Sequence, residues 1–254
     1  MAVSSDNKLT ILVHLHELRR RLIQSVIAVI ITTIISFVFA RQIFDILIVP
    51  MVEGKLIYIE MTEMIGTYMK VCLASGLILA MPYLIFQVMM FVFPALTSRE
   101  RKYIFLVLPW IAIMFMGGVA FGYFVLIPPA TTFLLTFGSE IASPEIKIGN
   151  YISVVTRLLL AIGLVFEMPV ITTFLARLGV ISPDWLAKKR KAAVISAFIL
   201  AAMITPTFDP INQSLVAIPL VILFEMSIWL AKLVHRREPR SVTPVTTLDP
   251  PDDG

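Results

Sequence analysis

Charged side chains are scarce in this 254-residue chain. Asp, Glu, Lys and Arg together make up 15% of it, whereas an ordinary soluble domain has about 25%. Apolar residues account for 58%, and the mean hydropathy is +0.91. A soluble fold of this size leaves much of its chain at the surface, so it cannot bury that much apolar material. The composition therefore excludes a soluble enzyme and a disordered protein, and it indicates a polytopic membrane protein.

Residues that bind metals or act as nucleophiles are also few. Cys72 is the single cysteine, and the three histidines, His14, His16 and His235, all lie near the ends of the sequence. One cysteine allows neither a disulfide framework nor a cysteine-based metal site. The sequence also lacks a phosphate-binding glycine loop and the HExxH and GxSxG motifs. We therefore predict no enzymatic activity, no catalytic residue, no metal site and no cofactor.

Long apolar stretches predict an all-α fold with six membrane-crossing helices. A helix needs about 20 residues to cross the hydrocarbon core. The predicted spans are residues 22–40, 68–93, 104–127, 152–175, 192–204 and 215–230. Residues 1–237 are expected to form a single transmembrane domain, and residues 238–254, which are rich in Pro and Asp, are expected to form a disordered tail.

The last two apolar stretches are short, with 13 and 16 residues. Two arrangements fit them. They can form one re-entrant hairpin, or two short helices that cross a locally thinned membrane. In both arrangements the two flanks of the pair lie on the same side of the membrane, so the topology of the other spans is unaffected.

The Lys and Arg residues predict the orientation of the spans. The N-terminal segment holds four, the loop after the second span three, the loop after the fourth span five, and the C-terminal tail four. The opposite side holds only Arg41, Lys55 and Lys147. Because basic loops stay on the cytoplasmic side, both termini are predicted to be cytoplasmic.

Two glutamates near this basic side are candidate binding residues. His14, Glu17 and Arg21 fall on one face of a helix in the sequence HLHELRRRL, and Glu100 stands between two arginines in SRERK. Two carboxylates at a membrane surface can hold two cationic side chains of a partner by paired hydrogen bonds. The alternatives are an ordinary interfacial helix around Glu17 and an ordinary basic loop around Glu100.

Glu167 lies in the middle of the fourth span. A carboxylate at such a depth costs roughly 2.5–3.5 kcal/mol, and it marks a functional site by default. The alternative is a purely structural hydrogen-bonding role. Gln213 and Arg157 are possible polar neighbours, although Arg157 is expected to extend toward the outer surface instead.

Four motifs in order along the chain resemble the TatC family. They are HLHELRRRL, FVFPALTSRERKY, FEMPV and TPTFDPINQSLVAIP, and the resemblance extends from about residue 12 to residue 232. It implies a curved, glove-like wall of six helices, of which the fifth and sixth are short. It further implies that the chain acts as the receptor subunit of the twin-arginine translocase. Such a receptor binds twin-arginine signal peptides at the cytoplasmic face and recruits TatA-type, and in some systems TatB-type, single-span subunits. Folded proteins are then exported at the expense of the protonmotive force.

The resemblance also implies roles for individual residues. Glu167 matches the family's groove glutamate, and Gln213 matches a polar residue that contacts partner subunits. Pro50 matches a proline of the first outer loop, and Pro206 and Asp209 lie in the connection between the last two spans. The positions that match signal-peptide-binding residues are Glu17, Glu100, Arg19, Arg21, Leu22, Phe91, Pro94 and Arg101.

Two residues depart from the family pattern. Phe208 and Met64 stand where many relatives have proline, so two loops are expected to differ in shape from those of the family. The competing class is a small-solute secondary transporter, because a charge at mid-depth and helices broken by proline are typical of such proteins. The lack of internal repeats argues against that class. The resemblance also predicts a homo-oligomeric receptor complex in the cell membrane.

Overall fold

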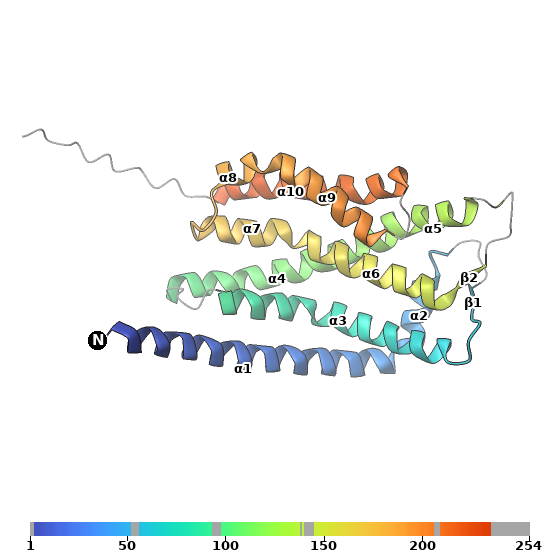
Figure 1. Ribbon diagram of the computed structural model, residues 1–254, viewed down its shortest axis with the longest axis horizontal. Helices are drawn as coiled ribbons and strands as arrows, with labels where there is room; N and C mark the ends of the chain where they lie inside the picture. Colours follow the sequence, from blue (N-terminus) through green and yellow to red (C-terminus); the bar gives the residue numbers. More distant parts are fainter. Residues whose placement is uncertain are drawn as a thin grey trace, which may run out of the picture.

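The computed structural model describes the backbone of residues 3–51, 56–92, 98–137, 139, 145–205 and 209–234. It describes the side chains of the same residues except 3–13, 92 and 98–106. The described part is almost entirely helical, and most of its helices run along the long axis of the molecule (Figure 1). The predicted all-α fold is therefore confirmed.

The first helix forms one edge of the molecule. α1 (Val3–Val38) continues after a break at Phe39 into α2 (Ala40–Ile48), and α1 packs along α3 (Glu63–Val92). The two helices approach so closely that a Cβ atom on Gly76 of α3 would lie 2.5 Å from Oγ1 of Thr33. The opposite face of α1 exposes large apolar side chains, as expected for a helix that faces lipid.

The third span is longer than the stretch 104–127 that the sequence predicts. α4 (Ser98–Phe121) passes through a π-helical turn, η1 (Gly122–Leu126), into α5 (Ile127–Thr136). Pro128 and Pro129 have no N–H to donate to the carbonyls four residues earlier, and those carbonyls lie within η1. The wider turn is the expected response of a helix to such a loss.

The fourth span is broken at Glu167. α6 (Ile148–Phe166) ends just before this residue and α7 (Met168–Arg177) begins just after it. Pro169 is the cause, because it cannot donate a hydrogen bond to the preceding turn. α7 ends in a Schellman motif, in which Gly179 has φ of 75° and the N–H of Val180 donates to the carbonyl of Leu175. A short helix, α8 (Pro183–Lys188), follows.

The last two helices differ in length. α9 (Arg190–Ile204) has 15 residues, so it is about 22 Å long, which confirms a short fifth span. α10 (Pro210–Val234) has 25 residues, so the predicted short sixth helix, 215–230, is corrected. The reason is that Asp209 caps α10 by accepting a hydrogen bond of 2.8 Å from the N–H of Asn212. The helix therefore begins at Pro210, and its first turn includes polar residues that precede the apolar stretch.

Two short strands tie together the end of the molecule where α3 and α6 begin. β1 (Leu56–Ile57) pairs in parallel with β2 (Ile146–Lys147). Beside them the carboxylate of Glu63 accepts hydrogen bonds from the N–H groups of Ile59, at 3.0 Å, and Gly149, at 3.3 Å. The chain segments before α3 and before α6 are thereby held side by side.

Five segments of the described chain are long and apolar enough to cross a membrane, and α9 is the sixth, shorter helix. The five are His14–Val38, Glu63–Phe91, Val107–Thr136, Ile148–Arg177 and Pro210–Val234. The largest core cluster surrounds α6, where Ile152, Val155 and Ile162 are fully buried. α6 is therefore the central helix against which the others are positioned.

Candidate functional site

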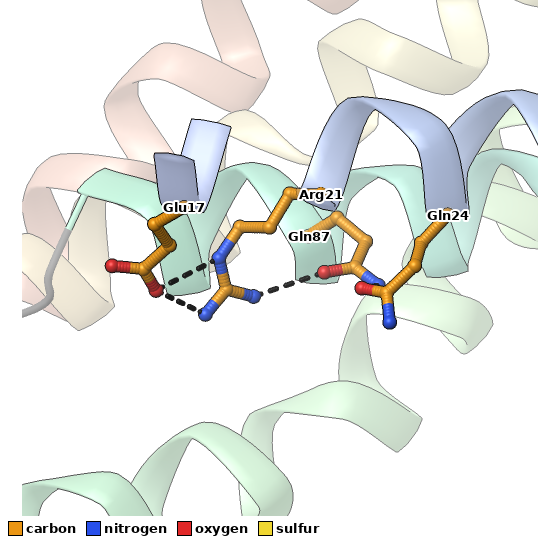
Figure 2. A network of polar contacts seen from close by, with 4 residues as sticks. All are labelled: Glu17, Arg21, Gln24 and Gln87. Carbon is orange, nitrogen blue, oxygen red and sulfur yellow. Dashed lines mark hydrogen bonds and ion pairs between the residues drawn. The ribbon is translucent and has the colours of Figure 1, made fainter. Parts of the chain in front are cut away.

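Glu17 belongs to a polar network between α1 and α3 (Figure 2). Nη2 and Nε of Arg21 donate to the same oxygen of Glu17, at 2.6 and 3.1 Å. Nη1 of Arg21 donates across to Oε1 of Gln87 on α3, at 3.0 Å. Gln87 in turn donates to Gln24 on α1 and to the hydroxyl of Tyr83. The network fixes both the side chain of Glu17 and the pairing of the two helices.

Aromatic packing continues the same face of α1. The ring of His14 stacks on Phe91 of α3, with 4.5 Å between the ring centroids. The predicted shared face of His14, Glu17 and Arg21 is thus confirmed, because all three lie against α3. Arg19 and Leu22 are exposed on other faces of α1. The structure therefore brings Glu17, Arg21 and Phe91 together and separates them from Arg19 and Leu22.

Gln87 is a site residue that the sequence reasoning missed. Its side chain is 5% exposed, and it bridges Arg21, Gln24 and Tyr83. A polar amide within an apolar span is the signal that could have identified it, since a buried amide requires hydrogen-bonding partners. Arg21 on α1 is one such partner for Gln87 on α3.

The carboxylate of Glu17 retains an accepting oxygen. Among the described residues its Oε2 atom accepts no hydrogen bond, because both bonds from Arg21 go to Oε1. The side chain is 30% exposed and borders an open hollow lined also by His16, Arg20 and Gln24. A cationic group can therefore reach Oε2 from solvent without displacing Arg21.

Three of the predicted signal-peptide-binding residues lie outside what the structure describes in full. Pro94 falls between the described ranges, and the side chains of Glu100 and Arg101 are not described. The backbone nevertheless puts Glu100 in the first turn of α4. That turn lies at the end of the molecule where α3 ends and where α1 carries Glu17 (Figure 1). The pairing of Glu17 with Glu100 stays a prediction.

Basic residues gather at this same end of the molecule. α7, α8 and α10 end there and α9 begins there (Figure 1). Arg41 and Lys147 lie at the opposite end, where β1 and β2 pair. The two groups of basic residues that the sequence defines therefore occupy opposite ends of the helices. The described residues at the end that holds Glu17 include Arg19, Arg20, Arg21, Arg177, Lys188, Lys189, Arg190, Lys191 and Lys232.

Glu167 is fully buried at the break between α6 and α7. Neither carboxyl oxygen has a hydrogen-bond partner among the described residues, although the backbone of Phe115 on α4 lies beside the group. The helices are closely packed here, since a Cβ atom on Gly118 of α4 would lie 2.8 Å from Cβ of Phe166. A buried carboxyl group without a partner is costly, so this position is unusual for a residue with only a structural role.

The predicted polar neighbours of Glu167 do not bond to it. Nε2 of Gln213 donates instead to the backbone carbonyl of Phe198 on α9, at 2.9 Å, and Arg157 is exposed two to three turns away on α6. Because Gln213 lies in the first turn of α10 and bonds to α9, it joins these two helices. Arg157 is exposed on α6, and its extension toward the outer surface stays a prediction.

Two of the three predicted loop residues, Pro50 and Asp209, lie at the ends of helices. The carbonyl of Pro50 accepts a hydrogen bond from the buried hydroxyl of Thr131 on α5, at 3.3 Å. Asp209 caps α10, while Pro206 lies outside the described residues. Pro50 and Asp209 therefore have structural contacts that link or begin helices.

Comparisons with known proteins agree with this architecture. The family model described as Sec-independent protein translocase protein (TatC) matches residues 13–219. The TatC protein of Carboxydothermus hydrogenoformans is 43% identical over 235 residues, which cover 92% of this chain and 97% of that protein. The TatCd protein of Bacillus subtilis is 36% identical over 239 residues, which cover 94% and 98%.

A solved structure is similar as well. The crystal structure of a twin-arginine translocase receptor, TatC, superposes with a TM-score of 0.78 at 41% identity, covering 88% of this chain and all of that chain. The relatives and the solved structure are matched over nearly their whole length, and the described helices are those of a multi-pass membrane protein. This chain belongs to the TatC family of Sec-independent protein translocase proteins.

Proposed function

We propose that this protein is the receptor of a twin-arginine translocase and that it binds signal peptides at the end of the bundle that carries Glu17. The observation that carries this proposal is the carboxylate of Glu17, which borders the hollow and whose Oε2 atom accepts no hydrogen bond among the described residues. The fold and the family of the chain support it. The protein acts as a binding and assembly component, without a catalytic step of its own.

The chemistry of the site favours an arginine on the partner. A guanidinium group can donate two parallel hydrogen bonds to a carboxylate, whereas the ammonium group of lysine makes a point contact. Within the chain, Arg21 already donates two hydrogen bonds to Glu17, and both reach Oε1, which leaves Oε2 for an arginine of the partner. Glu17 and Glu100 together would provide two carboxylates for the two arginines of a signal peptide.

The basic residues at the end of the bundle that holds Glu17 indicate the orientation of the protein in the membrane. The end that holds Glu17 also carries most of the basic residues, which stay on the cytoplasmic side of a membrane. We therefore place the receptor site and both termini in the cytoplasm, and the protein in the cell membrane. Glu17 is then positioned to meet a precursor before its export.

A crosslinking experiment tests the location of the site. A photoreactive residue in place of Arg20, which lines the hollow with Glu17, is expected to crosslink to a twin-arginine precursor and only weakly to its twin-lysine form. The same residue in place of Ile59, at the β1 end, serves as the control and should give no crosslink. Equal crosslinking from both positions would contradict the proposal.

Glu167 suits a second role, the recruitment of a TatA-type subunit or the support of an inserted signal peptide. Its two oxygens have no hydrogen-bond partner among the described residues, so a polar group on an incoming helix could donate to them. Such a bond would stabilise the complex, because the alternative for the carboxyl group is burial without a partner.

The role of Glu167 is testable by substitution. We expect Glu167→Gln to keep part of the hydrogen bonding and Glu167→Ala to lose co-purification with a TatA-type subunit and to lose export. Glu145→Gln, which changes an exposed carboxylate outside the helices, is the control. Normal assembly and export in Glu167→Ala would contradict this role of Glu167. The alternative of a small-solute transporter has no support from the family.

A further inference from the structure

Two cationic side chains lie inside apolar helices far from Glu17. Lys70 is seven residues from the start of α3 at Glu63, and Arg157 is nine residues from the start of α6 at Ile148. At 1.5 Å per residue they lie about 10 and 14 Å along their helices. Both side chains are exposed. Charged residues at such positions are expensive in a membrane and mark functional sites by default.

Ser153 connects the two cations into one cluster. Nζ of Lys70 donates to Oγ of Ser153 at 3.2 Å, and this hydroxyl donates to the carbonyl of Gly149 at 2.6 Å. Ser153 and Arg157 are four residues apart on α6, so they share a face one turn apart. Asn150, also exposed, belongs to the same face. We call Lys70, Ser153 and Arg157 the basic cluster of α3 and α6.

The basic cluster has no acidic partner within the described part of the chain. The ion pairs found there join Arg21 to Glu17 and Arg190 to Glu225, and neither involves Lys70 or Arg157. Glu63, the acidic residue at the start of α3, directs its carboxylate to two backbone N–H groups. Two positive charges therefore face the surroundings of the helices without internal compensation.

The short helix α9 ends beside α6, the helix that carries Ser153 and Arg157. Thr205, which ends α9, lines the same cavity as Val155 and Leu158 of α6. In Figure 1, α9 ends beside the middle of α6 and short of β1 and β2. Because α9 is about 22 Å long and a typical hydrocarbon core is about 30 Å thick, the membrane beside α9 is expected to be thinner than elsewhere.

We propose that Lys70, Ser153 and Arg157 bind the phosphate group of an anionic phospholipid in the leaflet on the β1–β2 side. Arg157 supplies a planar fork that fits phosphate oxygens, Lys70 supplies a point charge, and Ser153 positions the lysine. Basic pockets between membrane helices bind such headgroups. The bound headgroup lies below the normal membrane surface and so stabilises a thin bilayer next to α9.

Lipid binding to the purified full-length protein in detergent tests this proposal. Phosphatidylglycerol and phosphatidylcholine are titrated separately, and bound lipid is counted by native mass spectrometry. We expect the wild-type protein to prefer phosphatidylglycerol, and Lys70→Gln with Arg157→Gln to weaken its binding by about 10-fold or more. Arg41→Gln, an exposed cation at the same end of the molecule, is the matched control and should bind normally.

Two further arms keep the outcome decisive. Arg157→Lys keeps the positive charge and loses the planar guanidinium group, so we expect it to bind the lipid with intermediate affinity. This variant tests the proposal even if the double variant does not fold. Millimolar inorganic phosphate should not displace the lipid. The proposal is overturned if the Gln variants bind normally, if Arg41→Gln weakens binding as much as they do, if both lipids bind equally, or if free phosphate displaces the lipid. None of these readouts involves a signal peptide.

Discussion

Arg21 is the residue on which the geometry around Glu17 depends. Its guanidinium group donates to Glu17 on its own helix and to Gln87 on α3, and the side chain is only 18% exposed. Three nitrogens in one plane can serve both partners at once, and an ammonium group cannot do so with the same geometry. Arg21 is therefore best described as a residue that positions Glu17.

At the residue scale we predict that Arg21→Lys weakens binding of a twin-arginine peptide by about 10-fold, because charge-assisted hydrogen bonds contribute about 1.5–3 kcal/mol each and one or more would be lost. Arg41→Lys is the control, since Arg41 is an exposed arginine on α2 at the opposite end of the molecule. Peptide affinity in nanodiscs is the measurement. Equal affinities of both variants would refute the positioning role.

The sequence was sufficient to predict some of these residues but not their contacts. Helical spacing predicted that His14, Glu17 and Arg21 share a face, because the period of a helix fixes that relation. It could not predict Gln87, because the partner lies 66 residues from Arg21 along the chain and depends on how α1 packs against α3. It also grouped Arg19 and Leu22 with the site by resemblance, although they lie on other faces.

At the element scale, glycines set how closely the helices pack. A Cβ atom on Gly118 would lie 2.8 Å from Cβ of Phe166 and 3.0 Å from Cα of Gly163. These atoms belong to α6 itself and cannot rotate away. The close contact between α4 and α6 also holds Phe166, the neighbour of Glu167, so the position of the buried carboxyl group depends on it.

We predict that Gly118→Ala destabilises the protein by about 1–3 kcal/mol, the usual cost of overpacking, and lowers its thermal midpoint in detergent. Gly117→Ala is the matched control, because a Cβ atom there meets nothing within 4 Å. It should be neutral or slightly stabilising, since Ala is the better helix former. If the two variants melt at the same temperature, the packing argument is wrong.

Helix bounds show where sequence patterns succeed and fail at this scale. The six apolar stretches all fall on helices, the third and fourth on more than one, because hydropathy identifies segments that lie in lipid. The bounds differ because capping and backbone geometry determine them. Asp209 and Pro210 begin α10 before its apolar part, and prolines 128 and 129 widen the helix at η1 without ending the span.

At the scale of the whole molecule, α9 makes one side of the bundle thinner than the rest. α9 is about 22 Å long, whereas a typical hydrocarbon core is about 30 Å thick. α9 also ends beside the middle of α6 and short of β1 and β2 (Figure 1). The bilayer beside α9 is therefore expected to be thinned, which would lower the barrier to a polar cargo.

Lengthening α9 tests this expectation. Four leucines inserted after Ile199 add about 6 Å and rotate the rest of the helix by only about 40°. We predict a marked loss of export with normal membrane insertion and normal peptide binding. The control keeps the length of α9 and changes the exposed residues Val194, Ile195, Ile199 and Met203 to leucine. Unchanged export in the lengthened protein would argue against thinning as part of the mechanism.

The most direct test of the receptor assignment is the preference of the protein for arginine over lysine in its partner. Affinities of a twin-arginine and a twin-lysine peptide are measured for the wild-type protein, for Glu17→Gln with Glu100→Gln, and for the control Glu60→Gln at the opposite end. We predict that the wild-type protein and the control prefer arginine by about 10-fold or more, and that the double variant binds both peptides with equal, weak affinity. A double variant that retains the arginine preference would contradict the account.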